Sequence, residues 1–168
     1  MNSMPLPTDA EVYRVIRPKM VIHIPLGAIY PTWEAFRPTD QDKEQKPVRV
    51  SVWDANRTTS RQAKTLRITA TEADAARPVA DDLHVFALGV ADVTSTGERF
   101  KNNRMRVVHD PDGITNELAC LPGADGHSGI EGLDRENGTP KNEWKQVLLA
   151  LAGLCKPVED GDAESAQL

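Results

Sequence analysis

The sequence predicts an α+β, β-rich fold, in which an antiparallel sheet or sandwich of about six strands is closed by one amphipathic C-terminal helix at about 140–155. Seven of the 12 prolines lie within the first 47 residues, and proline excludes long helices from that part of the chain. Several later segments alternate polar and apolar residues and are joined mostly without helices, which favours antiparallel neighbours. A long apolar stripe at helical spacing occurs near the C-terminus, where a helix can cover the sheet.

Four strands are expected in the N-terminal half. The first two are 11–16 and 19–25, which are rich in valine and isoleucine. In 47–53 the valines alternate with Arg, Ser and Trp, so one face of this strand should be buried. The same alternation recurs in 64–70, with leucine and isoleucine inward.

The middle of the chain predicts a short helix and a hairpin. The helix should follow Thr71 and stop at Pro78. Residues 83–93 are apolar on both faces, as expected of a central strand. The polar residues 94–97 then form a turn into a second strand at 98–108.

The C-terminal helix has clear boundaries. Thr139 is a favourable N-cap, Pro140 fits the first helical position, and Pro157 ends the pattern. The apolar stripe consists of Trp144, Val147, Leu148, Leu151, Leu154 and Cys155. The chain is therefore expected to form one domain over 1–157, followed by an acidic and mobile tail at 158–168.

Composition narrows the class of protein. No apolar run approaches the roughly 18 residues of a membrane span, and the first residues lack the pattern of a secretory leader. The two cysteines form no Cys-x-x-Cys pair, which fits a reducing compartment. We therefore expect a soluble, cytoplasmic protein with no membrane partner.

The segment 109–138 is expected to be a long glycine-rich loop. It contains six of the 11 glycines, and four of them recur at every third position, Gly123, Gly126, Gly129 and Gly132. Backbone without Cβ atoms can approach a ligand closely or present N–H groups to an anion, so these four are candidate ligand-binding residues. Their spacing matches no phosphate loop or dinucleotide motif, and a loop that only packs or flexes is the alternative.

Acid, base and nucleophile types surround these glycines. His127 is the candidate general base, with Asp125 or His109 orienting it, and Cys120 lies seven residues before it as a candidate thiolate. Ser128 lacks the second glycine of a nucleophile elbow and is a poor candidate on that motif. The pattern is compatible with a small hydrolase or a ligand-binding enzyme, while the simpler interpretation of Cys120 is a packed apolar residue.

The same segment contains candidate metal ligands. His109, Asp112, Asp125 and His127 would form a site if the loop folded back on the end of the preceding strand. Their spacing fits neither a zinc motif nor a calcium loop, and the Asp-Pro-Asp-Gly stretch is also explained as a tight turn. No specific cofactor is predicted.

Charge is distributed unevenly along the chain. The net charge is -5, but residues 1–70 carry +4 and residues 71–168 carry -9. Basic residues of the expected hairpin could bind a phosphate backbone while Phe100 stacks on a base. These residues are Arg99, Lys101, Arg104 and Arg106. The acidic total charge disfavours nucleic acid, and neighbouring acids or a protein partner could neutralise the same side chains.

The primary functional hypothesis is a non-catalytic interaction or assembly domain that binds a protein partner or self-associates. No catalytic motif in the chain is specific, whereas irregular segments and charge asymmetry are abundant. Two alternatives stay open: a small hydrolase or ligand- or metal-binding enzyme centred on 109–138, and a nucleic-acid accessory protein. The enzyme hypothesis requires His109, Asp125 and His127 to converge in a concave pocket.

Overall fold

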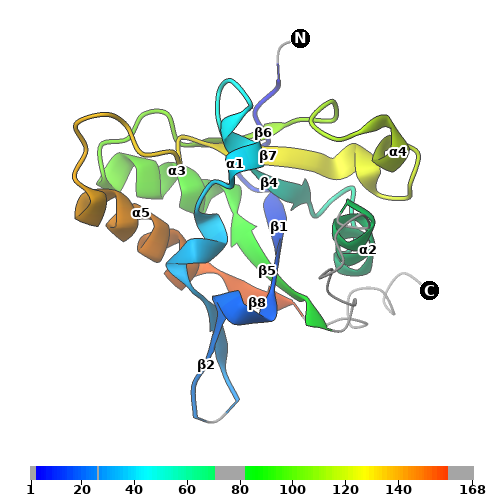
Figure 1. Ribbon diagram of the computed structural model, residues 1–168, viewed down its shortest axis with the longest axis horizontal. Helices are drawn as coiled ribbons and strands as arrows, with labels where there is room; N and C mark the ends of the chain where they lie inside the picture. The colour runs from blue at the N-terminus through cyan, green and yellow to red at the C-terminus, as the bar shows by residue number, and fades with distance from the viewer. Residues whose placement is uncertain (1–2, 26, 71–81, 159–168) are drawn as a thin grey trace.

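The computed structural model describes residues 3–25, 27–70 and 82–158. Its centre is a six-stranded sheet in the order β6-β7-β4-β1-β5-β8, with every neighbouring pair antiparallel (Figure 1). The strands of this sheet are β1 (Glu11–Ile16), β4 (Arg49–Asp54), β5 (His84–Gly89), β6 (Arg106–His109), β7 (His127–Glu131) and β8 (Lys156–Val158). The predicted α+β fold with an antiparallel sheet is confirmed.

Helices cover both faces of the sheet. α3 and α5 lie together against one face, and α2 and α4 pack against the other (Figure 1). The helices are α1 (Asp40–Lys43), α2 (Ser60–Ala70), α3 (Val90–Arg99), α4 (Asn116–Ala119) and α5 (Lys141–Leu154), with short turns η1 (Pro18–Met20), η2 (Trp33–Phe36) and η4 (Ala124–Gly126). Within the described ranges, every helix falls short of the length and apolar character needed to cross a bilayer.

Strand β4 separates two cores because its side chains alternate in direction. Its valines lie in the larger core, together with residues of α3, α5 and η2. Trp53 lies in the smaller core, which α2 and α4 complete. The two-faced strand predicted at 47–53 is therefore confirmed, and Arg49 and Ser51 share the face of Trp53.

The predicted C-terminal helix is also confirmed. Its predicted cap is wrong, because α5 starts at Lys141 with Pro140 rather than Thr139 at the N-cap and without a side-chain capping hydrogen bond. Leu148 and Leu151 are fully buried between this helix and the sheet. The predicted strand 11–16 corresponds to β1. Of the predicted strand 19–25, only β2 (Val21–His23) is extended, because η1 includes the first residues.

The predicted strand at 64–70 is wrong, because these residues belong to α2. Ala63 and Leu66 are buried at helical spacing against the smaller core. A capping box precedes the helix: Thr59 Oγ1 accepts from the Gln62 N–H, and Gln62 Oε1 accepts from the Thr59 N–H. A few alternating residues are compatible with the period of a strand and with that of a helix. The capping box is therefore the better indication that a helix begins here.

The predicted strands 83–93 and 98–108 are correct only in part, and the hairpin between them is wrong. Strand β5 ends at Gly89, where α3 begins, and β6 starts only at Arg106. The expected turn 94–97 lies inside α3, where threonine and serine hydroxyls donate to carbonyls of the preceding helical turn. The apolar run 83–93 fits either a strand or a buried helix, so its periodicity does not show where β5 ends and α3 begins.

The prediction of one long loop at 109–138 is wrong, because this segment contains α4, η4 and β7. Strand β7 is buried along its whole length and pairs with β4 and β6. Glycine is rare in strand interiors, which is why the sequence pattern indicates a loop. The helix expected after Thr71 and nearly all of the tail expected at 158–168 lie outside the described residues.

Replacing Leu148 by alanine should lower the free energy of unfolding by about 2–5 kcal/mol, because the buried side chain would leave a cavity. The adjacent Leu149 is 43% exposed and is the matched control. Leu149→Ala should change the free energy of unfolding by less than about 0.5 kcal/mol. Urea denaturation followed by circular dichroism measures both, and equal losses would contradict the placement of α5.

Candidate functional site

A cavity of about 810 Å³ lies at the ends of β1 and β4, on the sheet face that α2 covers. Its lining comes from β1, α1, β4, α2 and the residues around α4. The polar part of the lining includes Arg14, Arg17, Ser51, Arg67 and His127. A cavity of this volume falls within the range of about 300–1,000 Å³ typical of small-molecule sites.

The cavity lies where the sheet separates. β1 pairs with β4 at only two positions, whereas it pairs with β5 at six. Beyond the paired residues, Arg14 Nη1 donates to the Ser51 carbonyl and Arg14 Nε donates to the Ala35 carbonyl, each at 2.8 Å. A guanidinium therefore bridges β1 and β4 after their backbone pairing stops.

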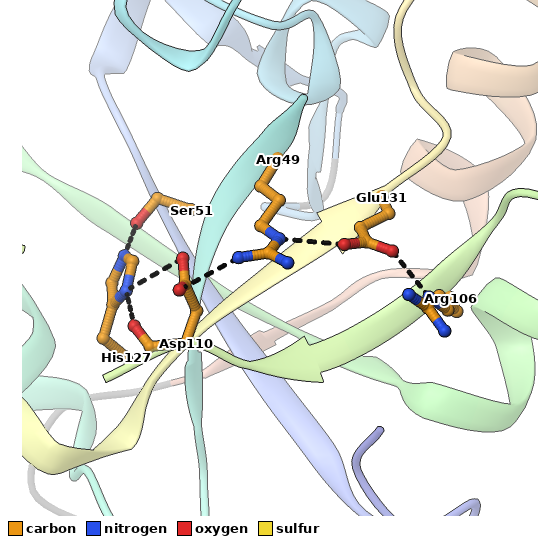
Figure 2. A network of polar contacts seen from close by, with 6 residues as sticks. All are labelled: Arg49, Ser51, Arg106, Asp110, His127 and Glu131. Carbon is orange, nitrogen blue, oxygen red and sulfur yellow. Dashed lines mark hydrogen bonds and ion pairs between the residues drawn. The ribbon is translucent and has the colours of Figure 1, made fainter. Parts of the chain in front are cut away.

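His127, at the start of β7, is buried at the edge of this cavity. Its Nδ1 lies 2.7 Å from the Asp110 backbone carbonyl, and its Nε2 lies 2.8 Å from Ser51 Oγ (Figure 2). A carbonyl only accepts hydrogen bonds, so in the neutral ring Nδ1 carries the hydrogen and Nε2 accepts from the serine hydroxyl. The Trp53 ring packs edge to face against the imidazole, with ring centroids 5.0 Å apart.

Burial sets the protonation state of His127. Removal of the ring from water lowers its pKa below the ordinary value of 6.5, and the Asp110 carbonyl and carboxylate offset only part of this effect. The nearby charge of His109 lowers the pKa further. The imidazole is therefore neutral at neutral pH, with the Nε2 lone pair directed at the Ser51 hydroxyl.

The Asp110 carboxylate lies beside the imidazole without a hydrogen bond to it. Its Oδ1 accepts from Arg49 Nη1 at 3.0 Å, whereas Oδ2 lies 3.9 Å from His127 Nδ1. Among the described residues, this buried Oδ2 has no hydrogen-bond partner. Gly113 packs against both groups, because a Cβ atom there would overlap Asp110 Oδ2 and crowd the imidazole. The protein thus holds the Asp110 carboxylate next to the His127 ring, although one carboxylate oxygen loses its hydrogen bonds to water.

Arg49 links three strands through two buried carboxylates. Its Nη1 pairs with Asp110 directly after β6, and its Nε pairs with Glu131 of β7 at 2.9 Å. Arg106 of β6 pairs with the other oxygen of Glu131 and completes the row in Figure 2. A Cβ atom at Gly129 would lie only 2.8 Å from Arg49 Cβ, so glycine at this position leaves room for the arginine to cross β7.

In the described part of the chain, four arginines and three acidic residues line the cavity: Arg14, Arg17, Arg49 and Arg67, and Asp40, Asp42 and Glu117. Burial lowers the pKa of Arg14 to about 10, so this group is still protonated at neutral pH. Burial also lowers the pKa of Arg67, and the positive charge of Arg17 lowers it further. Asp42 of α1 offsets part of this charge, although its carboxylate already accepts from the Thr39 N–H at 2.8 Å.

Of the predicted catalytic residues, His127 lines the cavity, but its expected partners do not orient it. His109 Nε2 donates to the Asp125 backbone carbonyl at 2.6 Å, and the Asp125 side chain is exposed. The Asp110 carbonyl holds Nδ1 instead. Cys120 is exposed, and its thiol donates to a carbonyl of its own helical turn. The prediction that the side chains of His109, Asp125 and His127 converge is therefore wrong.

The predicted metal ligands His109, Asp112, Asp125 and His127 do not form a ligand set. Across the described ranges, no group of three or more His, Cys, Asp and Glu side chains could hold a metal ion. Asp112 and Asp125 are exposed, whereas both ring nitrogens of His127 are engaged in hydrogen bonds.

The four glycines predicted to bind a ligand instead leave room for other parts of the protein. At each of them an added Cβ atom would crowd a neighbouring side chain or backbone. The pairs are Gly123 with Gln62, Gly126 with Thr58, Gly129 with Arg49, and Gly132 with the Arg104 backbone. The described lining of the cavity includes none of the four.

The basic residues predicted to bind nucleic acid are partly neutralised within the protein. Acidic side chains form ion pairs with two of them. The pairs are Arg104 with Asp134, Arg104 with Glu136, and Arg106 with Glu131. Arg99 lies over the Phe100 ring, and Lys101 is exposed.

Sequence reasoning missed Ser51 and Arg14 as site residues. The alternation in 47–53 places Ser51 correctly on the polar face of its strand, but nothing local shows that this face borders a cavity. Ser51 and His127 are 76 residues apart in the chain. The one feature of the sequence that could have indicated Ser51 was its position between two valines of a strand. A serine at such a position is also typical of a strand face exposed to solvent.

No protein-family model matches the chain, and neither does any curated protein or any solved structure. Function is therefore inferred from the cavity itself. Its distinctive features are a cluster of arginines at one end and a neutral histidine hydrogen-bonded to a serine.

The pKa of His127 should lie below 6.5, with the neutral ring protonated on Nδ1. Because an unfolded chain binds a proton there at higher pH than the folded chain does, the free energy of unfolding should fall as pH drops below about 6.5. Nitrogen NMR of the ring measures the pKa and the tautomer, with His127→Gln to assign the signals. Urea denaturation should show a shallower pH dependence for that variant. A proton on Nε2 would contradict the assignment.

Proposed function

We propose that this protein binds a small anionic molecule in the cavity at the ends of β1 and β4. The observation that carries the proposal concerns Arg14. Its guanidinium is withdrawn from water, yet it donates to two uncharged carbonyls, those of Ser51 and Ala35. Within the described ranges no carboxylate forms an ion pair with it. An anionic ligand would supply the missing negative charge.

Two more arginines favour an anion at the same end of the cavity. Arg17 and Arg67 are close enough for the positive charge of one to lower the pKa of the other. Like charges in a concave, partly desolvated site raise the local concentration of anions. Three acidic residues of the described lining, Asp40, Asp42 and Glu117, reduce this potential. A ligand with a single negative charge is therefore the best match.

The rest of the lining defines the uncharged part of the ligand. Apolar residues of β1, β4, α2 and α4 line the cavity, among them Trp53, Leu66 and Leu118. A small molecule with an acidic group and an apolar portion would use both ends of this site. The concave shape and the ion-paired state of Arg104 and Arg106 favour such a molecule over a nucleic acid.

Binding can be tested with fragment pairs of equal shape, each a carboxylate and its amide, such as phenylpropionate and phenylpropionamide. The anionic member of each pair should bind more tightly, because only it neutralises the arginines. Arg17→Ala should weaken binding by about tenfold, which corresponds to about 1.4 kcal/mol. The exposed Arg37 lies outside the described lining, so Arg37→Ala is the control. NMR titration measures these affinities, and equal binding of acids and amides would refute the proposal.

We propose as a second function self-association through the hairpin of β2 and β3 (Ile29–Pro31), in line with the interaction role expected from the sequence. This hairpin extends away from the rest of the protein in Figure 1. It exposes Ile22, Ile24 and Tyr30 by 50%, 39% and 44%. Its sheet has no third strand among the described residues, and an open edge can pair with the same edge of a second copy about a two-fold axis.

Ile22→Asp should abolish this self-association, because a charge would be placed on the apolar face of the hairpin. Sedimentation velocity over a wide range of protein concentrations measures the oligomeric state. Leu149→Asp is the control, since Leu149 is exposed on α5 and lies outside the hairpin. A wild-type protein that stays monomeric at every concentration would refute this second function.

A further inference from the structure

We infer that Ser51 is a nucleophile and His127 its general base, and that the cavity hydrolyses a small ester that carries a negatively charged group. The inference rests on the proposed anion-binding function, because the arginines must hold the acidic group of the substrate. It adds a reaction and two catalytic residues that anion binding alone does not require.

The first support is the geometry of the pair. Ser51 Oγ lies 2.8 Å from His127 Nε2, within the range of about 2.6–3.2 Å expected for a nucleophile and its base. The Asp110 carbonyl holds the hydrogen on Nδ1, so Nε2 is the nitrogen free to accept the serine proton. A nucleophile, a base and a group that orients the base are therefore connected in series.

The second support is a comparison with the adjacent serine of the sheet. Ser128 lies across from β4 in strand β7, is fully buried, and donates its hydroxyl to the Gly126 carbonyl. Both serines line the cavity, but Ser51 is only partly buried and directs its hydroxyl to an imidazole. Of these two serines, Ser51 is the more accessible and the one whose hydroxyl lies against a base.

The third support is the unpaired oxygen of Asp110. Buried polar atoms are nearly always hydrogen-bonded, so an exception calls for an explanation. Asp110 Oδ2 lies 3.9 Å from His127 Nδ1 and would stabilise the imidazolium that forms when the ring accepts a proton. The carboxylate thus acts as a positioning and charge-stabilising group.

A positive charge also lies beside the serine. Arg14 Nη1 donates to the Ser51 carbonyl, so its guanidinium is fixed next to the reacting residue. Negative charge develops on the acyl oxygen when a hydroxyl attacks an ester, and a fixed cation nearby lowers the energy of that state. Arg17 also lines the cavity and adds positive charge that favours the acidic group of the substrate.

The reaction proceeds in two balanced steps. Ser51 Oγ forms a bond to the ester carbonyl carbon, its proton passes to His127 Nε2, and the ester C–O bond breaks as that proton moves to the leaving alcohol. Water then attacks the acyl-serine, gives one proton to His127, and releases the carboxylic acid as the proton returns to Ser51 Oγ. The net reaction converts ester and water to acid and alcohol.

Two nitrophenyl esters test the activity: the glutarate monoester, which carries a carboxylate, and the uncharged valerate ester. The wild-type protein should hydrolyse the glutarate ester faster. Ser51→Ala and His127→Gln should each lower the rate by about 10²–10⁴-fold. Ser95→Ala is the control, because Ser95 is exposed on α3 over the other face of the sheet. A fluorophosphonate reagent followed by peptide mass spectrometry should place the label on Ser51.

The role of Asp110 has its own readout, the pH dependence of kcat/KM. The charged groups around His127 are Asp110 and His109 at the end of β6 and Asp42 in α1. Because the Asp110 carboxylate raises the pKa of His127, Asp110→Asn should move the acid limb of the profile to lower pH. A purely structural role would lower the rate without moving that limb.

The outcomes separate this inference from the proposed binding function. Wild-type rates in Ser51→Ala, or a label confined to another residue, overturn the catalytic role of Ser51. If Ser51→Ala still binds phenylpropionate but the wild-type protein neither hydrolyses the esters nor takes the label, the inference fails and the binding function stands. If neither protein distinguishes phenylpropionate from phenylpropionamide, the binding function fails.

Discussion

The Arg49 side chain is the constraint on which the site depends. It leaves β4, crosses β7 over Gly129, and pairs with Asp110 and Glu131. Both carboxylates are buried, and removal of their cation would leave uncompensated charge in the protein interior. Because Asp110 also supplies the carbonyl that holds His127 Nδ1, the guanidinium sets the orientation of the imidazole through its partner.

The two faces of the sheet differ in how completely helices cover them. One face is covered by α3 and α5, and its residues form a continuous apolar core. The other is only partly covered by α2 and α4, which leaves the cavity beside β1 and β4. The larger core contains most of the buried apolar residues, and their burial offsets the desolvation cost of the polar groups on the other face. Strand β4 belongs to both faces, so Ser51 is held on a rigid element.

The errors in the sequence predictions have two physical causes. A short alternating or apolar segment carries no unique period, so 64–70 and 83–93 fit a strand and a helix equally well. The Thr59 and Gln62 capping box would have distinguished the two for α2. The spacing of Gly126 and Gly129 indicates a loop when only the sequence is considered. In the folded protein, neighbouring side chains occupy the space where the Cβ atoms of these residues would lie, and the sequence does not show this.

Local chemistry was enough to predict the α+β class, the C-terminal helix and the two-faced strand at 47–53. Proline positions, helical periodicity and alternation act between near neighbours in the chain. The sequence also indicated His127 as a candidate base, and this residue lines the cavity. Its partners were decided by the tertiary structure alone, since Ser51 is 76 residues away and Asp110 is 17 residues away. Strand pairing brings such distant residues together, and no local pattern distinguishes a polar strand face in water from one that lines a cavity.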